Sequence, residues 1–410
     1  MGWRSTSFKV VALCGFTFFL VTDVAAGVKK TSKEVQTAFT GHIEGDVSIS
    51  GMNAGSPSVS AGVTSASDSS EANSFVTKTW SRLLERLASD GFDQYELRDL
   101  FSQPEIIFDP SPMVHKMNEL HSAKLRAERI KPIQERLAVL GYRPGPIDGK
   151  IGAKTRRAII AFQYVHGLPL DGTPAEDLLR RLEGELRKAP PNIMHLDLPM
   201  ETGPKVYRSV LQPERIREAK DFLALNEDLL RSVHRRYGIS PKVAVSLLAL
   251  ETRVGNYLGE EGAFATLSSM AACADFSKIE PLLKNQPVKP RFRGWLQKRC
   301  QQKADWAYKE LKALLRYAEG NKLNLLDIPG SKYGAIGICQ FMPTNALIYG
   351  IDGDGDGKID LFTAEDALPS MGNFLRHHGW KKGMGARKAL YRYNRNTTYV
   401  NTILALAEHL

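Results

Sequence analysis

One glutamate in this 410-residue sequence has a setting that favours acid–base chemistry. Glu251 follows the run Val243–Leu250, in which only Ser246 is polar. Such a run predicts a central, buried helix, and a carboxyl group at its end loses much of its hydration. Desolvation raises a carboxyl pKa, and a carboxylic acid that is still protonated near neutral pH can protonate a glycosidic oxygen. The simpler interpretation is that Glu251 only marks the polar end of a core helix.

Two later segments carry side chains suited to holding a sugar. The stretch 331–343 is rich in glycine and contains Gln340, whose amide can both donate and accept hydrogen bonds. Near the C-terminus, the tyrosines Tyr393 and Tyr399 can stack on sugar faces, and Asn394 can bind an acetamido group. Together with Glu251, these segments predict a site for a carbohydrate.

A cluster of aspartates predicts a calcium loop. Asp352, Asp354, Asp356 and Asp360 fall at positions 1, 3, 5 and 9 of an EF-hand-type loop, and the Lys358 carbonyl falls at position 7. So many carboxylates in one turn would repel one another without a cation. The alternative is a turn that binds no metal. We expect a structural Ca²⁺ with no part in bond cleavage.

The segment 133–182 is a self-contained pattern of three short helices separated by turns. Its turn elements Ile147-Asp148-Gly149 and Asp171-Gly172 alternate with Phe162-Gln163 and Gly167-Leu168, and each aspartate can bind its own turn backbone. This pattern resembles the peptidoglycan-binding module of the three-helix kind, which implies binding to the bacterial wall. The alternative is a helical spacer without a ligand.

The segments around Glu251, 331–343 and 391–399, in this order, resemble the catalytic domain of the membrane-bound lytic murein transglycosylase B family. The resemblance covers roughly 213–410 and extends to the helices at 79–120. It implies that Glu251 is the catalytic acid and base. The family's substrate-site positions fall here on Ser331, Gln340, Tyr393, Asn394 and Tyr399.

The same resemblance bears on three other features. It implies that Asp366 closes the calcium loop, with Glu365 as the alternative, because Thr363 stands where an EF-hand has its closing glutamate. Cys339 departs from the small residue or proline expected at its position, and the Lys- and Arg-rich stretch 273–303 fits the family poorly, as a local insertion would. The implied fold is a mainly α (α+β, lysozyme-like) catalytic domain with an inserted or preceding three-helix module.

The mechanism depends on there being one carboxyl group. Glycosidases use two, and Glu260 and Glu261 lie in a polar loop rather than in a comparable setting. Glu251 alone would protonate the leaving oxygen and then deprotonate the C6 hydroxyl of N-acetylmuramic acid, closing a 1,6-anhydro ring. We therefore expect a lytic murein transglycosylase that cleaves the β-1,4 bond between N-acetylmuramic acid and N-acetylglucosamine. A hydrolytic muramidase and a catalytically inactive, calcium-dependent wall-binding protein remain alternatives.

The chain divides into six expected regions. They are a signal peptide (1–26), a disordered linker (27–78), N-terminal helices that begin the catalytic domain (79–129), the peptidoglycan-binding module (130–186), a second linker (187–206) and the catalytic domain (207–410). The first has two basic residues, an apolar stretch of twelve residues from Val10 to Val21, and the small residues Ala25-Ala26. An uncleaved anchor and a lipoprotein signal at Cys14 are the alternatives.

Charge and cysteine content add expectations about partners and compartment. The net charge of +10 fits an acidic partner, and a carboxylate-bearing wall polymer is one such partner. No zinc-finger or aromatic-basic strand motif supports nucleic acid. We expect a monomer that binds peptidoglycan strands in the periplasm, with membrane association and other cell-wall enzymes as open possibilities. Cys273 and Cys300 are the favoured disulfide pair, which leaves Cys339 free.

Overall fold

The computed structural model describes residues 80–185, 204–284, 287–380 and 385–410. The expected signal peptide, the first linker and most of the second linker lie outside these residues. The described chain is almost wholly helical, which confirms the prediction of a mainly α protein. Its named strands β1 (Glu261–Gly262) and β2 (Pro329–Gly330) form one antiparallel pair, in which Glu261 faces Gly330. No helix among the described residues is long and apolar enough to cross a membrane.

The helices follow one another along the chain with short connections. A first helix at 80–89 is followed by α3 (Gln94–Ser102), α4 (Ser111–Val139), α5 (Ala153–Val165), α6 (Leu178–Gly184), η2 (Arg208–Leu211), α7 (Pro213–Leu225), α8 (Glu227–Tyr237), α9 (Pro241–Thr252), α10 (Ala263–Ala272), α11 (Phe276–Ile279), η3 (Glu280–Leu282), α12 (Pro290–Asn321), η4 (Leu325–Asp327), α13 (Pro343–Tyr349), α14 (Ala364–His377), α15 (Ala386–Tyr393) and α16 (Thr397–His409).

Two separate apolar cores organise these helices. The larger core draws buried side chains from Trp80 to Met117 and again from Val210 to Leu406. The smaller core lies between them in the sequence, from Ile130 to Leu182. The first helices therefore pack with the C-terminal half of the chain, although the smaller core separates them from it in the sequence.

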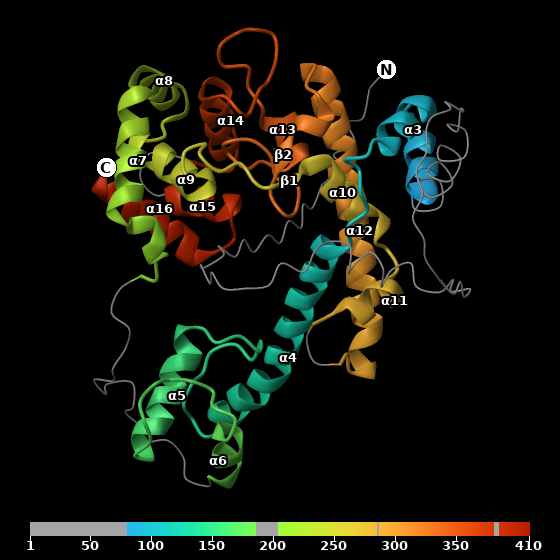
Figure 1. The fold of residues 1–410 in the computed structure, drawn as a ribbon. Coiled ribbons are helices and arrows are strands. Elements are labelled where there is room, and N and C mark those ends of the chain that lie inside the picture. Colours follow the sequence, from blue (N-terminus) through green and yellow to red (C-terminus); the bar gives the residue numbers. More distant parts are fainter. Residues whose placement is uncertain (1–79, 186–203, 285–286, 381–384) are drawn as a thin grey trace, which may run out of the picture.

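The helix α4 belongs to both cores (Figure 1). Its N-terminal half buries Met113 and Met117 in the larger core, and its C-terminal half buries Ile133 and Leu137 in the smaller one. The sequence predicts a break here, with one helix ending near residue 129. The structure corrects this: α4 continues through Pro132, whose missing N–H removes only one helical hydrogen bond while both flanking halves are held by packing.

The smaller core has two turns built in the same way. In each, a glutamine on a helix holds an Asp-Gly turn: Gln134 accepts from the Gly149 N–H at 2.8 Å, and Gln163 accepts from the Gly172 N–H at 2.9 Å. The aspartates also bind their own turns, since Asp148 accepts from the Lys150 N–H at 2.9 Å. The turn motif therefore forms this unit's local structure, as expected.

The helix α9 lies at the centre of the larger core and is contacted by α7, α8 and α16. Its residues from Ala244 to Leu250 are all buried, and each buried leucine contributes about 1.5–3 kcal/mol relative to an exposed one. The amphipathic pattern over 214–237 predicts one helix, whereas the structure has two, α7 and α8, which meet at Asn226.

The basic stretch 273–303 is part of the core rather than a loose insertion. Its second half begins α12, a helix of 32 residues that packs along α10 and starts 15 residues before the expected Asp305. Leu296 and Cys300 of this stretch are fully buried. The expected disulfide is not formed: Cys273, Cys300 and Cys339 are free thiols, and the Cys300 thiol instead donates to the Cys273 carbonyl at 3.1 Å.

Candidate active site

Glu251 lies in the last turn of α9, where the apolar helix reaches the edge of the core. The helix ends abruptly after Thr252, because Arg253 and Val254 both adopt left-handed backbone angles, with φ of 53° and 55°. A cation binds this helix end, since Arg215 donates to the Ala249 carbonyl at 2.6 Å. Arg253 is itself fixed by an ion pair with Glu218. The backbone that carries Glu251 is thus held from several sides.

The carboxyl group of Glu251 is surrounded by protein, although part of the side chain remains accessible to solvent. Burial raises its pKa from an ordinary 4.5 to about 7, against the opposing effect of a hydrogen bond from the Tyr399 hydroxyl. In the part of the chain that the structure describes, no other carboxylate acts on this pKa. Burial raises the pKa of Tyr399, and the nearby charge of Glu251 raises it further.

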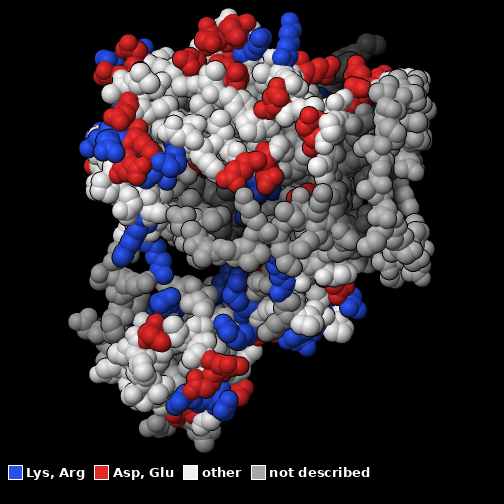
Figure 2. Space-filling view, in the orientation of Figure 1, with Lys and Arg blue, Asp and Glu red and all other residues white. Residues whose placement is uncertain are grey.

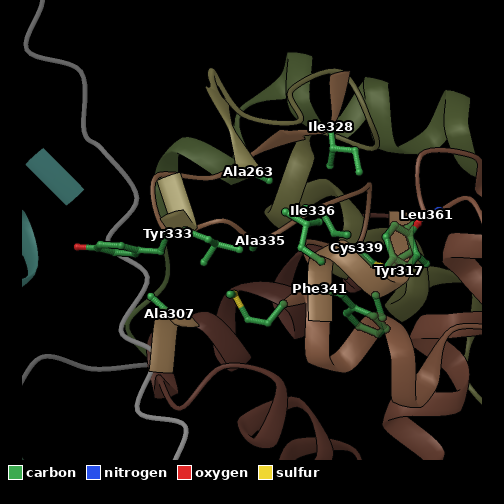
Figure 3. Packing of buried hydrophobic residues seen from close by; sticks show 14 of the residues in the cluster. Ala263, Ala307, Tyr317, Ile328, Tyr333, Ala335, Ile336, Cys339, Phe341 and Leu361 are labelled. Atoms are coloured by element: carbon green, nitrogen blue, oxygen red, sulfur yellow. Dashed lines mark hydrogen bonds between the residues drawn. The ribbon is translucent and has the colours of Figure 1, made fainter. Parts of the chain in front are cut away.

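The segment 331–343 forms the wall beside Glu251. It folds into tight turns bridged between Gly330 and Ile336 and between Ile336 and Phe341. Thr252, next to Glu251, donates to the Ile338 carbonyl at 2.8 Å, so the end of α9 and this segment are directly joined. Figure 3 shows Ile336 and Phe341 of the segment among the buried apolar side chains.

Glycine is required at one position of this segment. Gly337 has φ of 73°, and a Cβ there would lie 2.5 Å from the Leu361 carbonyl oxygen. The neighbouring Ile338 N–H donates to that same carbonyl at 2.8 Å. The glycine-rich composition therefore permits close backbone packing behind the site.

Gln340 and Tyr393 are both tied to the backbone of this wall. Gln340 takes a left-handed φ of 49° and donates to the carbonyls of Leu258 at 3.3 Å and Gly337 at 3.1 Å. Tyr393 donates to the carbonyl of Cys339, and the charge of Glu251 contributes to the raised pKa of Tyr393. Tyr393 thus lies near Glu251, whereas Gln340 is held by the backbone of the wall and is only partly buried.

Ser331 and Asn394 differ in how far their side chains are engaged. The Ser331 hydroxyl accepts from the N–H groups of Tyr333 and Ala335, at 3.4 and 3.1 Å, and so serves its own turn. Asn394 is 3% exposed, and its side-chain oxygen has no hydrogen-bond partner among the described residues. A buried amide oxygen without a partner costs free energy, and Asn394 is therefore distinguished from Ser331 by an unused acceptor.

Sequence reasoning missed the residues that hold the site in place. The Tyr333 hydroxyl donates to Glu119 of α4 at 3.0 Å, and Lys116 donates to the same carboxylate at 2.7 Å. A second tie runs from Glu310 of α12, which accepts from the N–H and hydroxyl of Thr344, both at 2.9 Å. The contacts from Tyr333 to Glu119 and from Glu310 to Thr344 join residues more than 30 positions apart, and no local pattern could have indicated them.

The aspartate loop lies between α13 and α14. Carboxylate oxygens of Asp352, Asp354 and Asp356 come within 4.8 Å of one another. Asp366 is 2% exposed, and its pKa is raised by burial and by the charges of Asp352 and Asp354, while it accepts from the Gly353 and Asp360 N–H groups. This donor set of converging oxygens fits a hard cation such as Ca²⁺.

Comparison with known proteins identifies both cores. Residues 185–388 match the family described as the transglycosylase SLT domain. The chain therefore contains a transglycosylase SLT domain. Residues 126–182 match the putative peptidoglycan binding domain, so the smaller core is a module of that kind.

One curated relative and two solved structures illustrate the similarity. The membrane-bound lytic murein transglycosylase B of Escherichia coli K12 is 27% identical over 176 residues, which are 43% of this chain and 42% of the relative's length. The Escherichia coli lytic transglycosylase Slt35 in complex with bulgecin A is 19% identical, with a TM-score of 0.41 over 62% of this chain and 92% of that one. The soluble lytic transglycosylase SltB1 from Pseudomonas aeruginosa is 20% identical, with a TM-score of 0.41 over 62% of this chain and 97% of that one.

Proposed function

We propose that this SLT-domain chain is a lytic murein transglycosylase that cleaves the β-1,4 bond between N-acetylmuramic acid and N-acetylglucosamine. The observation that carries the proposal is Glu251, a single carboxyl group with a pKa of about 7 and no second carboxylate acting on it. A hydrolase with two carboxyl groups needs a nucleophile or a base beside the acid. A single group suits a reaction in which the substrate supplies its own nucleophile.

Glu251 would take both proton-transfer roles in turn. Near neutral pH a group with this pKa is present in both forms, which suits donation in one step and acceptance in the next. The acid first protonates the glycosidic oxygen as the bond to N-acetylglucosamine breaks, and the substrate's N-acetyl group stabilises the anomeric carbon. The Glu251 carboxylate then accepts the proton of the C6 hydroxyl of N-acetylmuramic acid, whose oxygen attacks the anomeric carbon. The product is a 1,6-anhydro ring, and no water enters.

The surrounding residues have separate proposed roles. Tyr399 orients the carboxyl group of Glu251 through its hydrogen bond. Tyr393 fixes the Cys339 backbone, so its ring is a wall of the site rather than a free stacking surface. The unpartnered oxygen of Asn394 accepts the N–H of an acetamido group. Gln340 and Ser331 shape the glycine-rich wall, and their contacts with substrate stay a prediction.

Other features of the chain complete the proposal. Ca²⁺ would be held by oxygens of Asp352, Asp354, Asp356, the Lys358 carbonyl, Asp360 and Asp366, and would join α13 to α14 in a structural role. The module at 130–186 would be inserted into the catalytic domain, because helices before and after it share one core. Action on murein implies a location outside the cytoplasm, in agreement with the expected signal peptide.

Product analysis tests the reaction. Purified peptidoglycan sacculi are digested with the wild type, Glu251→Gln and the exposed-loop control Glu260→Gln, and the products are analysed by mass spectrometry. We expect 1,6-anhydro-muramyl ends from the wild type and the control. The Glu251→Gln variant should lose at least about 10²–10⁴-fold in rate, since it can neither donate nor accept the proton.

Two results would overturn the proposal in different ways. Reducing ends without anhydro ends would make the enzyme a muramidase that uses water. Full activity of Glu251→Gln would place the acid on another residue.

A further inference from the structure

A basic surface lies where α4 and α12 run beside each other, outside the site described above. We call it the α4–α12 basic face and define it by these residues: Lys124, Glu128, Lys289, Arg291, Trp295, Lys298 and Arg299. It carries five cations against one carboxylate. The spacing of 291, 295, 298 and 299 puts these four residues on one side of α12, since residues three and four apart are neighbours on a helix.

The charges of this face are only partly balanced. Glu128 of α4 forms ion pairs with both Lys289, at 2.6 Å, and Arg291. Lys298 and Arg299 are exposed, and neither has a carboxylate partner within the ranges that the structure describes. A net positive field therefore remains over the outer part of the face.

An aromatic ring lies within this field. Trp295 is partly exposed, with the Lys124 ammonium 5.3 Å and the Arg299 guanidinium 5.5 Å from its ring centre. Each such cation–π contact is a weak attraction at an exposed site. A partly exposed indole beside cations offers an apolar surface to a sugar or peptide and positive charge to its carboxylates.

The face lies between the module and the larger core. Lys124 and Glu128 stand on the part of α4 between its two buried parts, which end and begin at His121 and Ile130. Figure 2 shows Lys and Arg side chains gathered in this region, between the module and the main body. The face therefore lies on the part of α4 that connects the module with the larger core.

We propose that the α4–α12 basic face binds the carboxylates of peptidoglycan peptide stems and so guides a strand from the module toward the site of Glu251. This inference rests on the proposed function, because it takes murein as the substrate. The face adds affinity through charge and leaves the bond-breaking step to Glu251.

An anionic membrane is the other source of negative charge, and the composition of this face argues against it. Helices that bind a bilayer surface present large apolar side chains that enter it. Among the described residues of 273–303, no large hydrophobic side chain is exposed, whereas α13 exposes Leu347 and Ile348. The face thus has the charge for binding a carboxylated polymer without the apolar residues for insertion.

Retention on sacculi tests the proposal with the full chain in the Glu251→Gln background, so that the polymer is not digested. The test variant is Lys298→Glu with Arg299→Glu. The matched control is Lys220→Glu with Arg235→Glu, which makes the same change in net charge at exposed positions of α7 and α8. We expect about tenfold weaker retention of the test variant at low salt, since each exposed charge interaction changes affinity by up to about fivefold and a reversal adds repulsion.

Two further conditions test whether retention depends on charge: high salt, and sacculi without free carboxylates. In about 1 M salt the screening length falls to roughly 3 Å, so the test variant and the control should be retained equally. Sacculi whose carboxylates have been amidated should retain the control only as weakly as the test variant.

Equal retention of the test variant and the control on untreated sacculi at low salt would overturn the proposal. So would selective loss of binding to vesicles containing phosphatidylglycerol with no change on sacculi, since the face would then serve a membrane. Neither result depends on the product analysis. If the product analysis shows no anhydro ends, the retention assay can still be interpreted by itself.

Discussion

The raised pKa of Glu251 makes a prediction about stability as well as about catalysis. A carboxyl group with a higher pKa in the folded than in the unfolded chain prefers to be protonated in the fold. Its stabilising contribution is complete below the unfolded pKa near 4.5 and is lost as pH rises through about 7. The variant Glu251→Gln carries a neutral amide at every pH and does not show this loss.

The magnitude follows from the two pKa values. The pKa rises from 4.5 to about 7, and each pKa unit corresponds to about 1.4 kcal/mol, which gives a difference of about 3 kcal/mol. This is an upper value, because part of the Glu251 side chain remains accessible to solvent. We therefore expect the free energies of unfolding of Glu251→Gln and wild type to be similar below pH 4.5. Above pH 7 the variant should be more stable by up to about 3 kcal/mol.

Urea unfolding followed by tryptophan fluorescence measures this difference in the right part of the molecule. Trp80 and Trp380 are buried in the larger core, and the module at 130–186 contains no tryptophan. The signal thus reports the larger core even if the module unfolds separately. The exposed α12 residue Glu319, changed to Gln, provides the baseline for losing one carboxyl group at the surface.

A difference between Glu251→Gln and wild type that is flat from pH 4.5 to 8.5 would refute the reasoning. So would a variant that becomes relatively less stable as pH rises. Either result would mean that the Glu251 carboxyl group keeps its hydration, and the case for a protonated acid near neutral pH would fall with it.

Three further predictions concern the site and the loop. Tyr399→Phe removes a hydrogen bond that lowers the pKa of Glu251. In the pH profile of kcat/KM, the fall in activity at high pH should therefore move upward by about 1–2 pH units. An unchanged pH profile would contradict this role of Tyr399. Calcium should raise the Tm of the wild type, and Asp352→Ala with Asp354→Ala should abolish the rise, as differential scanning calorimetry with and without chelator will report. Gly337→Ala should lower both the Tm and activity, because its Cβ meets a carbonyl oxygen at 2.5 Å. Gly294→Ala, with open space around it inside α12, should leave activity unchanged and should not lower the Tm, since alanine favours a helix more than glycine does.

The local features of the fold could be predicted because each has a short-range cause. The apolar run before Glu251 indicated a buried helix, and α9 is buried from Ala244 to Leu250. The Asp-Gly turns indicated short helices packed into a small unit, which is how the module is built. In both cases the pattern and the structural cause lie within a few residues.

The errors came from interactions that no local pattern contains. The continuity of α4 was not predicted, because it depends on packing at both halves of the helix, which outweighs the one hydrogen bond lost at Pro132. The density of Lys and Arg suggested that 273–303 is an insertion, but Leu296 and Cys300 recur at helical spacing and join the larger core. The disulfide was inferred because Cys273 and Cys300 flank one stretch of the sequence, which carries no information about where each thiol points.

The partners of Glu251 also show where sequence reasoning ended. Tyr399 was expected to contact the sugar, whereas the structure places its hydroxyl on the carboxyl group of Glu251. A contact across 148 positions depends on how α16 packs on α9. The residue type was therefore predictable as part of the site, and its particular contact was not.

The connection through α4 bears on how the two cores would work together. A helix of 29 residues is about 43 Å long and resists bending, whereas a flexible linker would only raise the local concentration of bound strand. Glu119 of this helix holds Tyr333, which lies in the same wall as Gln340. If the module binds murein as we propose, the strand is held at a fixed orientation to that wall as well as near it. If the α4–α12 basic face guides the strand as we propose, its cations act on the strand before any bond is broken.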